Sequence, residues 1–171
     1  MGNTTFVRGK GAFHGATVMP KRGLHIVGFK IRRRQQQGHG VGSPLGGCYY
    51  VGLAHGQPPV NSMSNLITRS DVFVLQDTDD QDQVPHLLLR RHCIPRNSHR
   101  RIFGHDEVVW VELNADLGEI TFYRDNMTLI GLAFANVDHV DDLYPLVYLF
   151  NDDASCEIMP SPSSSDESIE Q

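Results

Sequence analysis

The amino-acid sequence predicts an all-β protein built from antiparallel strands. Its 171 residues, 40% of them hydrophobic, suit a single domain with a buried core. From residue 103 to residue 159, short runs of alternating apolar and polar residues end at Gly118, at Asp125–Asn126 and at Tyr144–Pro145. Such alternation, with turn-forming residues between the runs, is typical of strands joined by hairpins. No segment shows a clear helical period, and there is no internal repeat.

The N-terminal half contains five segments that we expect to form strands. In the clearest of them, alternate residues form one side that we expect to be buried, namely Val27, Phe29 and Ile31. The turn residues Pro20–Gly23 precede this segment. The five expected strands are Phe6–Val7, Ala16–Met19, Leu24–Ile31, Cys48–Ala54 and Asp71–Leu75. Leu87–Leu89 fits a strand or a helical turn equally well.

The C-terminal half supplies most of the expected core. Its alternation places five residues on buried faces, which are Val109, Val111, Ile120, Phe122 and Val147. Trp110 is also a candidate for the core, because burial of so large a side chain contributes about 2–3 kcal/mol.

Polar segments separate or follow these strands. We expect exposed loops at 32–47, 76–83 and 95–101. Residues 160–171 are acidic and rich in Ser and Pro, so we expect a disordered tail after a domain that spans residues 4–159.

Cysteine content and hydropathy favour an intracellular protein. The three cysteines are widely spaced and odd in number, which favours a reducing compartment over a disulfide framework. No signal peptide is apparent, and no apolar segment is long enough to cross a membrane. The sequence does not distinguish the cytoplasm from the nucleus, and it leaves the oligomeric state open.

Charge is distributed very unevenly along the chain. Residues 1–70 contain nine Lys and Arg and no Asp or Glu, whereas residues 106–171 contain fifteen acidic residues and a single base, Arg124. Two halves of opposite charge could bind different partners. In a sheet that interleaves the two halves, the charges would instead partly neutralise each other across strands.

The sequence offers no convincing catalytic or metal site. The densest group of metal-binding residue types comprises His86, His92, Cys93, His99 and His105. It lacks the paired spacing of zinc ligands, and adjacent residues such as His92 and Cys93 point to opposite faces of a strand. There is no Gly-x-Ser-x-Gly motif and no phosphate-binding loop. We therefore predict that the protein is not an enzyme and has no catalytic residue, metal or cofactor.

The order of the C-terminal segments resembles the SPRY domain, a β-sandwich family used to bind other proteins. The resemblance covers about residues 11–159, and its motifs are Gly23–Ile31, Tyr50–Ala54, Phe103–Val109, Gly118–Asn126, Leu132–Phe134 and Tyr144–Val147. It implies an antiparallel two-sheet sandwich with long loops. Two family glycines are replaced, one by Trp110 and one by Met127, which leaves Asn126 as the turn residue expected to adopt a left-handed conformation.

The resemblance also implies a partner site on loops at one edge of the sandwich, and a protein or peptide as the partner. The positions that match this surface are His55, Gln57, Arg69, Asp71, Phe150, Asn151, Asp152 and Asp153. Loops on a rigid sandwich are a usual place for recognition. Phe150 could instead belong to the core.

Two alternatives stay open. An RNA-associated subunit would use basic loops at 32–34 and 90–101, with Arg32, Arg33, Arg34, Arg90, Arg91, Arg100 and Arg101 contacting phosphates. Binding of single strands would also need exposed aromatic side chains, and only Tyr49 and Tyr50 lie near the first of these loops. A carbohydrate-binding module is the second alternative.

Overall fold

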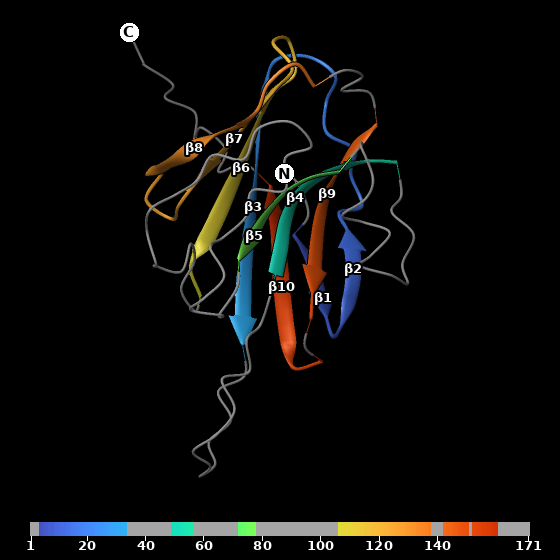
Figure 1. Ribbon diagram of the computed structural model, residues 1–171. Coiled ribbons are helices and arrows are strands. Elements are labelled where there is room, and N and C mark those ends of the chain that lie inside the picture. The colour runs from blue at the N-terminus through green and yellow to red at the C-terminus, as the bar shows by residue number, and fades with distance from the viewer. Residues whose placement is uncertain are drawn as a thin grey trace, which may run out of the picture.

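The protein is a sandwich of two antiparallel β-sheets (Figure 1). The structure, a computed structural model, describes residues 4–33, 49–56, 72–77, 106–137, 142–150 and 152–160. All regular secondary structure within these ranges is strand, which confirms the predicted all-β class. Within the same ranges, no helix that could cross a membrane is found.

The larger sheet has six strands in the order β1-β10-β3-β6-β7-β8. Its central strand, β3, pairs with the last strand of the fold on one side and with the β6–β7–β8 meander on the other. The bounds are β1 Thr5–Arg8, β3 Leu24–Arg33, β6 Val108–Asn114, β7 Glu119–Tyr123, β8 Leu129–Phe134 and β10 Ala154–Pro160. Pro160, expected to begin the tail, is thus the last residue of a strand, and residues 161–171 lie outside the described ranges.

The smaller sheet has four strands in the order β2-β9-β4-β5, with bounds β2 Gly11–His14, β4 Tyr49–His55, β5 Val72–Asp77 and β9 Leu143–Leu149. β4 and β9 are its two central strands, and their register runs from Tyr49 opposite Leu149 to His55 opposite Leu143. The two strands therefore run in opposite directions over their whole length.

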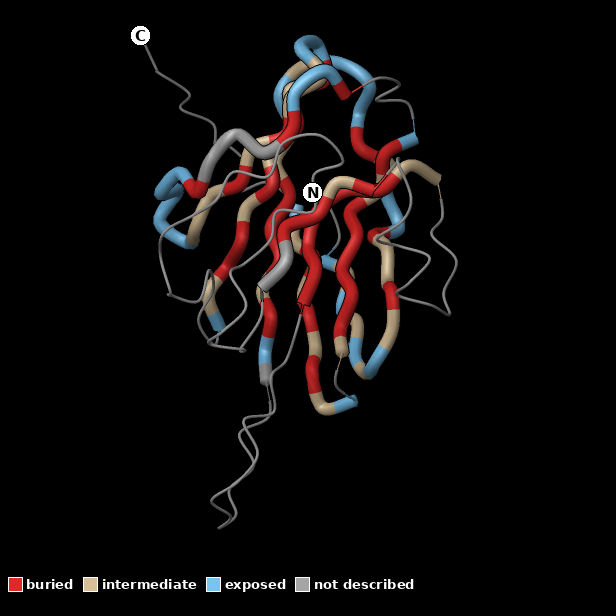
Figure 2. The backbone as a smooth tube through the Cα atoms, viewed as in Figure 1, coloured by how far each residue is buried: buried red, intermediate tan, exposed pale blue. Residues whose placement is uncertain are grey.

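The main hydrophobic core lies between the two sheets (Figure 2). Side chains on alternate positions of each strand point into it, as the period of two requires. Phe29, Phe122 and Leu53 are fully buried there. All eight residues predicted to be buried by alternation are buried, which are Val27, Phe29, Ile31, Val109, Val111, Ile120, Phe122 and Val147.

A second apolar cluster lies on the outer face of the four-stranded sheet. It comprises Ala12, Tyr50, Ala54, Val72, Val74, Leu146 and Tyr148, with Phe150 packed against it. The rings of Tyr50, Tyr148 and Phe150 contact one another at centroid distances of 5.0–6.3 Å. Phe150 is partly buried and packs against this outer cluster, not in the main core between the sheets.

Five local expectations were wrong. The expected loops at 32–47 and 76–83 begin too early, because Arg32–Arg33 end β3 and Gln76–Asp77 end β5. Trp110 lies on the outer face of the six-stranded sheet and is only partly buried, because the inward positions of β6 belong to its neighbours Val109 and Val111. Ala16–Met19 forms no strand; the strand comes earlier, as β2, and Met19 is held by a hydrogen bond from its N–H to the carbonyl of Leu143. In the β7–β8 turn, Met127 and not Asn126 adopts the left-handed conformation, with φ 57°.

Two strand glycines are required by close packing. A Cβ atom on Gly52 of β4 would lie 2.0 Å from the carbonyl oxygen of Phe73 in β5. A Cβ atom on Gly28 of β3 would lie 2.6 Å from the ring of Trp110, which covers this glycine from the neighbouring strand. The first obstacle is backbone and cannot move, whereas the second is a side chain at the surface.

We expect Gly52→Ala to lower the free energy of unfolding by at least about 3 kcal/mol, because β5 would have to separate from β4. The matched change Gly28→Ala should cost only about 1 kcal/mol, since the Trp110 ring can turn towards solvent. Urea unfolding followed by circular dichroism measures both. Equal losses for the two variants would contradict this account of the β4–β5 contact.

Candidate functional site

Three strands of the smaller sheet meet at one end of the sandwich, at the upper right of Figure 1. β4 ends at His55, which pairs with Leu143, the first residue of β9. β5 begins at Val72, which pairs with Ala54. We call this region, with His14, His55, Asp142 and Tyr144, the His55 end.

Backbone hydrogen bonds fix the chain at the His55 end. The N–H of Gly56 donates to the carbonyl of Asp142 at 2.9 Å, and the N–H of Met19 donates to that of Leu143 at 2.7 Å. Gly56 and Asp142 both have left-handed φ, of 67° and 59°. Such a conformation is uncommon for a residue with a side chain, although Asp tolerates it better than most. Turns at the strand ends are therefore anchored to the sheet.

Polar and aromatic side chains lie near these turns on both faces of the sheet, because Tyr144 pairs with the outward-facing Ala54 whereas His55 alternates to the other face. His14 and Tyr144 contact each other edge to face, with ring centroids 6.0 Å apart, and both are partly buried. His55 is also partly buried, and Asp142 is exposed. Imidazole and phenol groups can donate or accept hydrogen bonds and a carboxylate can accept them, so each of these side chains could contact a polar peptide at this end of the sheet.

Among the described residues, the other predicted partner positions, Phe150, Asp152 and Asp153, lie away from the His55 end. Phe150 follows β9 at its far end, because Leu149 pairs with Tyr49 and Leu143 pairs with His55. Six residues of strand separate these two pairs, which corresponds to about 20 Å. Gln57, Arg69, Asp71 and Asn151 lie outside the described residues.

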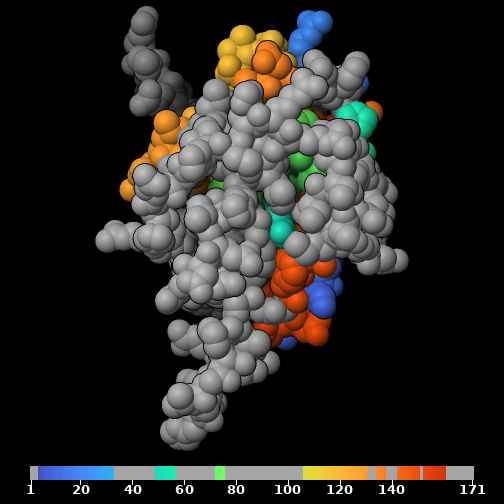
Figure 3. Space-filling view, viewed as in Figure 1, coloured from blue at the N-terminus to red at the C-terminus, as the bar shows by residue number. Residues whose placement is uncertain are grey.

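The turn that carries Asp152 and Asp153 packs against the β1–β2 turn. The N–H of Lys10 donates to Oδ1 of Asp152 at 3.4 Å. In the space-filling view, strands from the two ends of the chain lie together in the lower part of the molecule, blue beside red-orange (Figure 3). Phe150, which precedes this turn, packs on the outer cluster.

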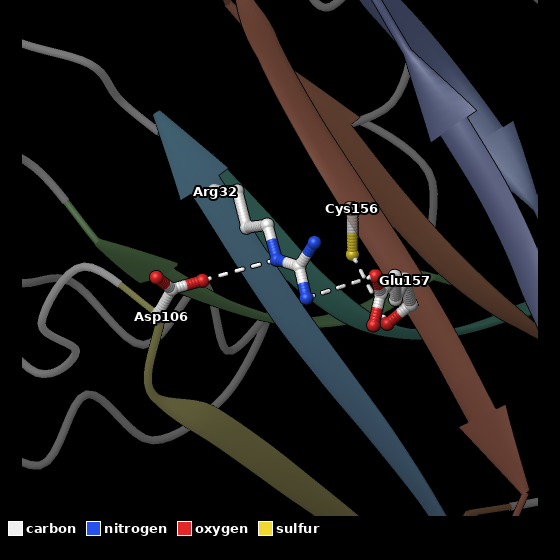
Figure 4. Close-up of polar contacts among 4 residues, drawn as sticks. All are labelled: Arg32, Asp106, Cys156 and Glu157. Atoms are coloured by element: carbon white, nitrogen blue, oxygen red, sulfur yellow. Dashed lines mark hydrogen bonds and ion pairs between the residues drawn. The ribbon is translucent and has the colours of Figure 1, made fainter. Parts of the chain in front are cut away.

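Arg32, a candidate phosphate-binding residue, lies between two carboxylates (Figure 4). Its Nε atom is 3.1 Å from Oδ1 of Asp106, and its Nη2 atom is 3.1 Å from Oε1 of Glu157. Each pair joins the basic N-terminal half to the acidic C-terminal half, as expected if the fold interleaves the two charges. Because both pairs are exposed to solvent, each contributes at most about 1 kcal/mol.

The remaining residues of the RNA alternative are two tyrosines, the strand residue Arg33 and a set outside the described residues. Tyr49 and Tyr50 are both buried, so neither ring is available to stack on a base. Arg33 is the last residue of β3. Arg34, Arg90, Arg91, Arg100 and Arg101 lie outside the described ranges, as does the histidine-rich group at 86–105.

Shifted pKa values occur at two places in the described part of the chain. Burial, followed by a hydrogen bond of 3.1 Å to Oε1 of Glu112, raises the pKa of Tyr123. Burial, followed by the charge of Glu157, raises the pKa of the Cys156 thiol, which therefore stays protonated. A thiol of this kind is a poor nucleophile. Among the described residues, no group of His, Cys, Asp and Glu is arranged to hold a metal ion.

Comparison with solved structures shows which known fold the chain resembles. The SPRY domain of human HERC1 superposes with a TM-score of 0.56 at 20% sequence identity, covering 90% of this chain and 84% of that one. The chain has a SPRY-like fold. The NHR1 domain of Drosophila melanogaster neuralized is similar with a TM-score of 0.51 and 11% identity, over 91% of this chain and 86% of that one. The TRIM65 PSpry domain follows with a TM-score of 0.50 and 13% identity, over 86% of this chain and 69% of that one.

Similarity at the level of sequence alone is too low for detection. No protein-family model matches the chain, and no curated protein matches it. The likeness to SPRY domains therefore establishes the fold, and the site has to be argued from the side chains.

Sequence reasoning missed His14, Asp142 and Tyr144 as members of the His55 end. Each lies far from His55 in the sequence, and the pairing of β9 with β2 and β4 is what brings their strands to the same part of the sheet. Tyr144 belongs to a motif that carried the SPRY resemblance, which is the one signal that could have directed attention to it.

The buried Cys156 makes stability depend on alkaline pH. Its folded pKa lies above the unfolded value of about 8.5, so the stabilisation is complete below pH 8.5 and is lost as pH rises towards the folded pKa. Between pH 8 and pH 10, the wild-type free energy of unfolding should fall by about 2 kcal/mol more than that of Cys156→Ala. Urea unfolding at the two pH values measures this, and equal pH dependence in both proteins would show that Cys156 ionises in the folded state.

Proposed function

We propose that the protein is a non-catalytic module that binds a protein or peptide through its His55 end, as an intracellular subunit or adaptor of a larger complex. The observation that carries the proposal is the convergence of three strand ends at this place, held by the Gly56–Asp142 and Met19–Leu143 hydrogen bonds. A rigid sheet that presents anchored turns can bind a partner with little loss of conformational entropy.

Two further observations support this function. The SPRY-like fold belongs to an architecture whose members, by the resemblance stated above, bind proteins through loops at one edge. The free, buried Cys156 also suits a reducing compartment. The opposite end of the sandwich is the weaker candidate, because Phe150 and Asp152 are engaged in packing and hydrogen bonding there.

A capture experiment with two matched double variants tests the proposal. His55→Ala with Asp142→Asn removes two polar groups from the His55 end, and Asn keeps the tolerance for a left-handed backbone. Lys10→Ala with Asp152→Asn makes a similar change at the opposite end. The full chain and both variants serve as bait, and quantitative mass spectrometry compares the captured proteins with and without nuclease.

We expect a set of proteins that withstands nuclease and falls at least about fivefold with the His55-end variant, because a few side chains carry most of the binding energy. The Lys10 and Asp152 variant should capture the same set at wild-type levels. Thermal melts of both variants establish that they fold.

Either of two results would overturn the proposal. Loss of every captured protein after nuclease treatment would favour an RNA-associated subunit. The RNA alternative would be supported further if the protein bound RNA with a salt-sensitive affinity and a triple variant, Arg32→Ser with Arg33→Ser and Arg34→Ser, lost that affinity. Capture that the His55-end variant leaves unchanged would place the partner site elsewhere.

A further inference from the structure

A row of apolar side chains crosses the outer face of the six-stranded sheet. The strand register places Met159, Gly28, Trp110, Tyr123 and Leu129 side by side on five adjacent strands. Leu129 is 58% exposed, and Met127 in the adjoining β7–β8 turn is 44% exposed. We call Trp110, Tyr123, Met127 and Leu129 the Trp110 patch. Exposed apolar groups that adjoin in this way are typical of interaction sites.

The patch contains a strained residue. Met127 has φ 57°, where glycine would adopt the same backbone conformation without steric cost. Its turn is fixed by hydrogen bonds, from the N–H of Met127 to the carbonyl of Arg124 and from the N–H of Thr128 to Oδ1 of Asn126. A large exposed side chain is thus kept at a position that disfavours side chains. Strain of this kind is found at functional positions.

The chain segment that carries the patch is acidic, although Lys30 of β3 lies on the same face, opposite Val108. Residues 106–137, which form β6, β7 and β8 with their turns, contain six Asp and Glu and only one base, Arg124. Glu112 lies on the same strand as Trp110, two residues away, and its Oε1 accepts a hydrogen bond from the hydroxyl of Tyr123 at 3.1 Å. A carboxylate can accept several hydrogen bonds, so Glu112 is positioned beside the patch and can still accept from a cationic group.

We propose that the Trp110 patch binds an extended segment of a partner protein in which apolar side chains are flanked by Lys or Arg. The apolar side chains would cover Trp110 and Leu129, and the basic flanks would contact Glu112 and the other acids of β6–β8. The excess of acids in this segment disfavours nucleic acid, whose phosphates they would repel. The surface belongs to the other sheet from the His55 end, so it is a second site and does not depend on the function proposed above.

Trp110 is the sole tryptophan of the chain, so its fluorescence reports on this site alone. The probes are a library of synthetic peptides KRXSXSXRK, with Leu, Val, Ile or Met at each X, and a matched library EDXSXSXDE. Neither library contains an aromatic residue. We expect the best basic peptides to change the Trp110 emission saturably and to bind at least about tenfold more tightly than their acidic counterparts.

Two variants separate binding from folding. Met127→Gly should raise the urea midpoint of unfolding, because it relieves the strain of the left-handed backbone. The same variant should lower the affinity for the best basic peptide at least about fivefold. Glu112→Gln keeps an acceptor for Tyr123 and should reduce both the affinity for basic peptides and its dependence on salt. Leu117→Ser is the matched control, since Leu117 is 63% exposed in the β6–β7 turn at the other end of the same strands, and it should bind as the wild type does.

Three outcomes would overturn the proposal. The first is the absence of any saturable change in Trp110 emission with basic peptides at millimolar concentration. The second is equal affinity of the wild-type protein for basic and acidic peptides, or an affinity of Met127→Gly for the best basic peptide that equals the wild-type value. The third is a dimer of the chain alone in sedimentation that Leu129→Ser dissociates, which would assign the patch to a second copy of this chain.

Discussion

The register between β4 and β9 is the constraint on which the other features of this sandwich depend. Side chains alternate between the two faces of a strand, so a slip of one residue would turn the buried Leu53 and Val147 outwards and bring residues of the outer cluster, such as Ala54 and Tyr148, into the main core. The same register fixes which turns meet. It sets His55 beside the start of β9 and leaves Phe150 at the opposite end, about 20 Å away.

Interleaving of the two halves of the chain explains the distribution of charge. β3, from the basic N-terminal part, lies between β10 and β6 from the acidic part, and Arg32 spans them through Asp106 and Glu157. This neutralisation operates only around β3. β6 pairs with β3, but β7 and β8 pair with no strand from the basic half, and residues 106–137 contain six acids and one base. Most of the apolar row around Trp110 lies in this segment. One face of the sheet therefore combines apolar and acidic character, a pairing that recognition of a basic segment would use.

Alternation within single strands was enough to predict the fold class and most of the core, because burial of one face is a local property of the sequence. Alternation also predicts the face on which Trp110 lies, because Val109 and Val111 can point inwards only if Trp110 points outwards. The large size of the tryptophan side chain suggested burial in the core, which was wrong. The candidate site was harder to predict. Whether Phe150 adjoins His55 depends on which strands pair and in which direction, and neither is encoded in the spacing of residues. The preference for Asn126 as the left-handed residue was reasonable from propensity, but the hydrogen bond from Thr128 to the Asn126 side chain holds that residue in the turn and leaves Met127 to take the positive φ.

The most direct test of this account is a pair of distance measurements by electron spin resonance between labels on engineered cysteines, in a background where Cys48 and Cys93 are replaced by Ser and the buried Cys156 by Ala. The account predicts a short distance between labels at Gly56 and Asp142, whose backbones are hydrogen-bonded. Labels at His55 and Asp152 should instead give a single distribution centred beyond about 20 Å. Two similarly short distances would mean that both turns belong to one rim of the sandwich, and the register of β4 with β9 described here would then be incorrect.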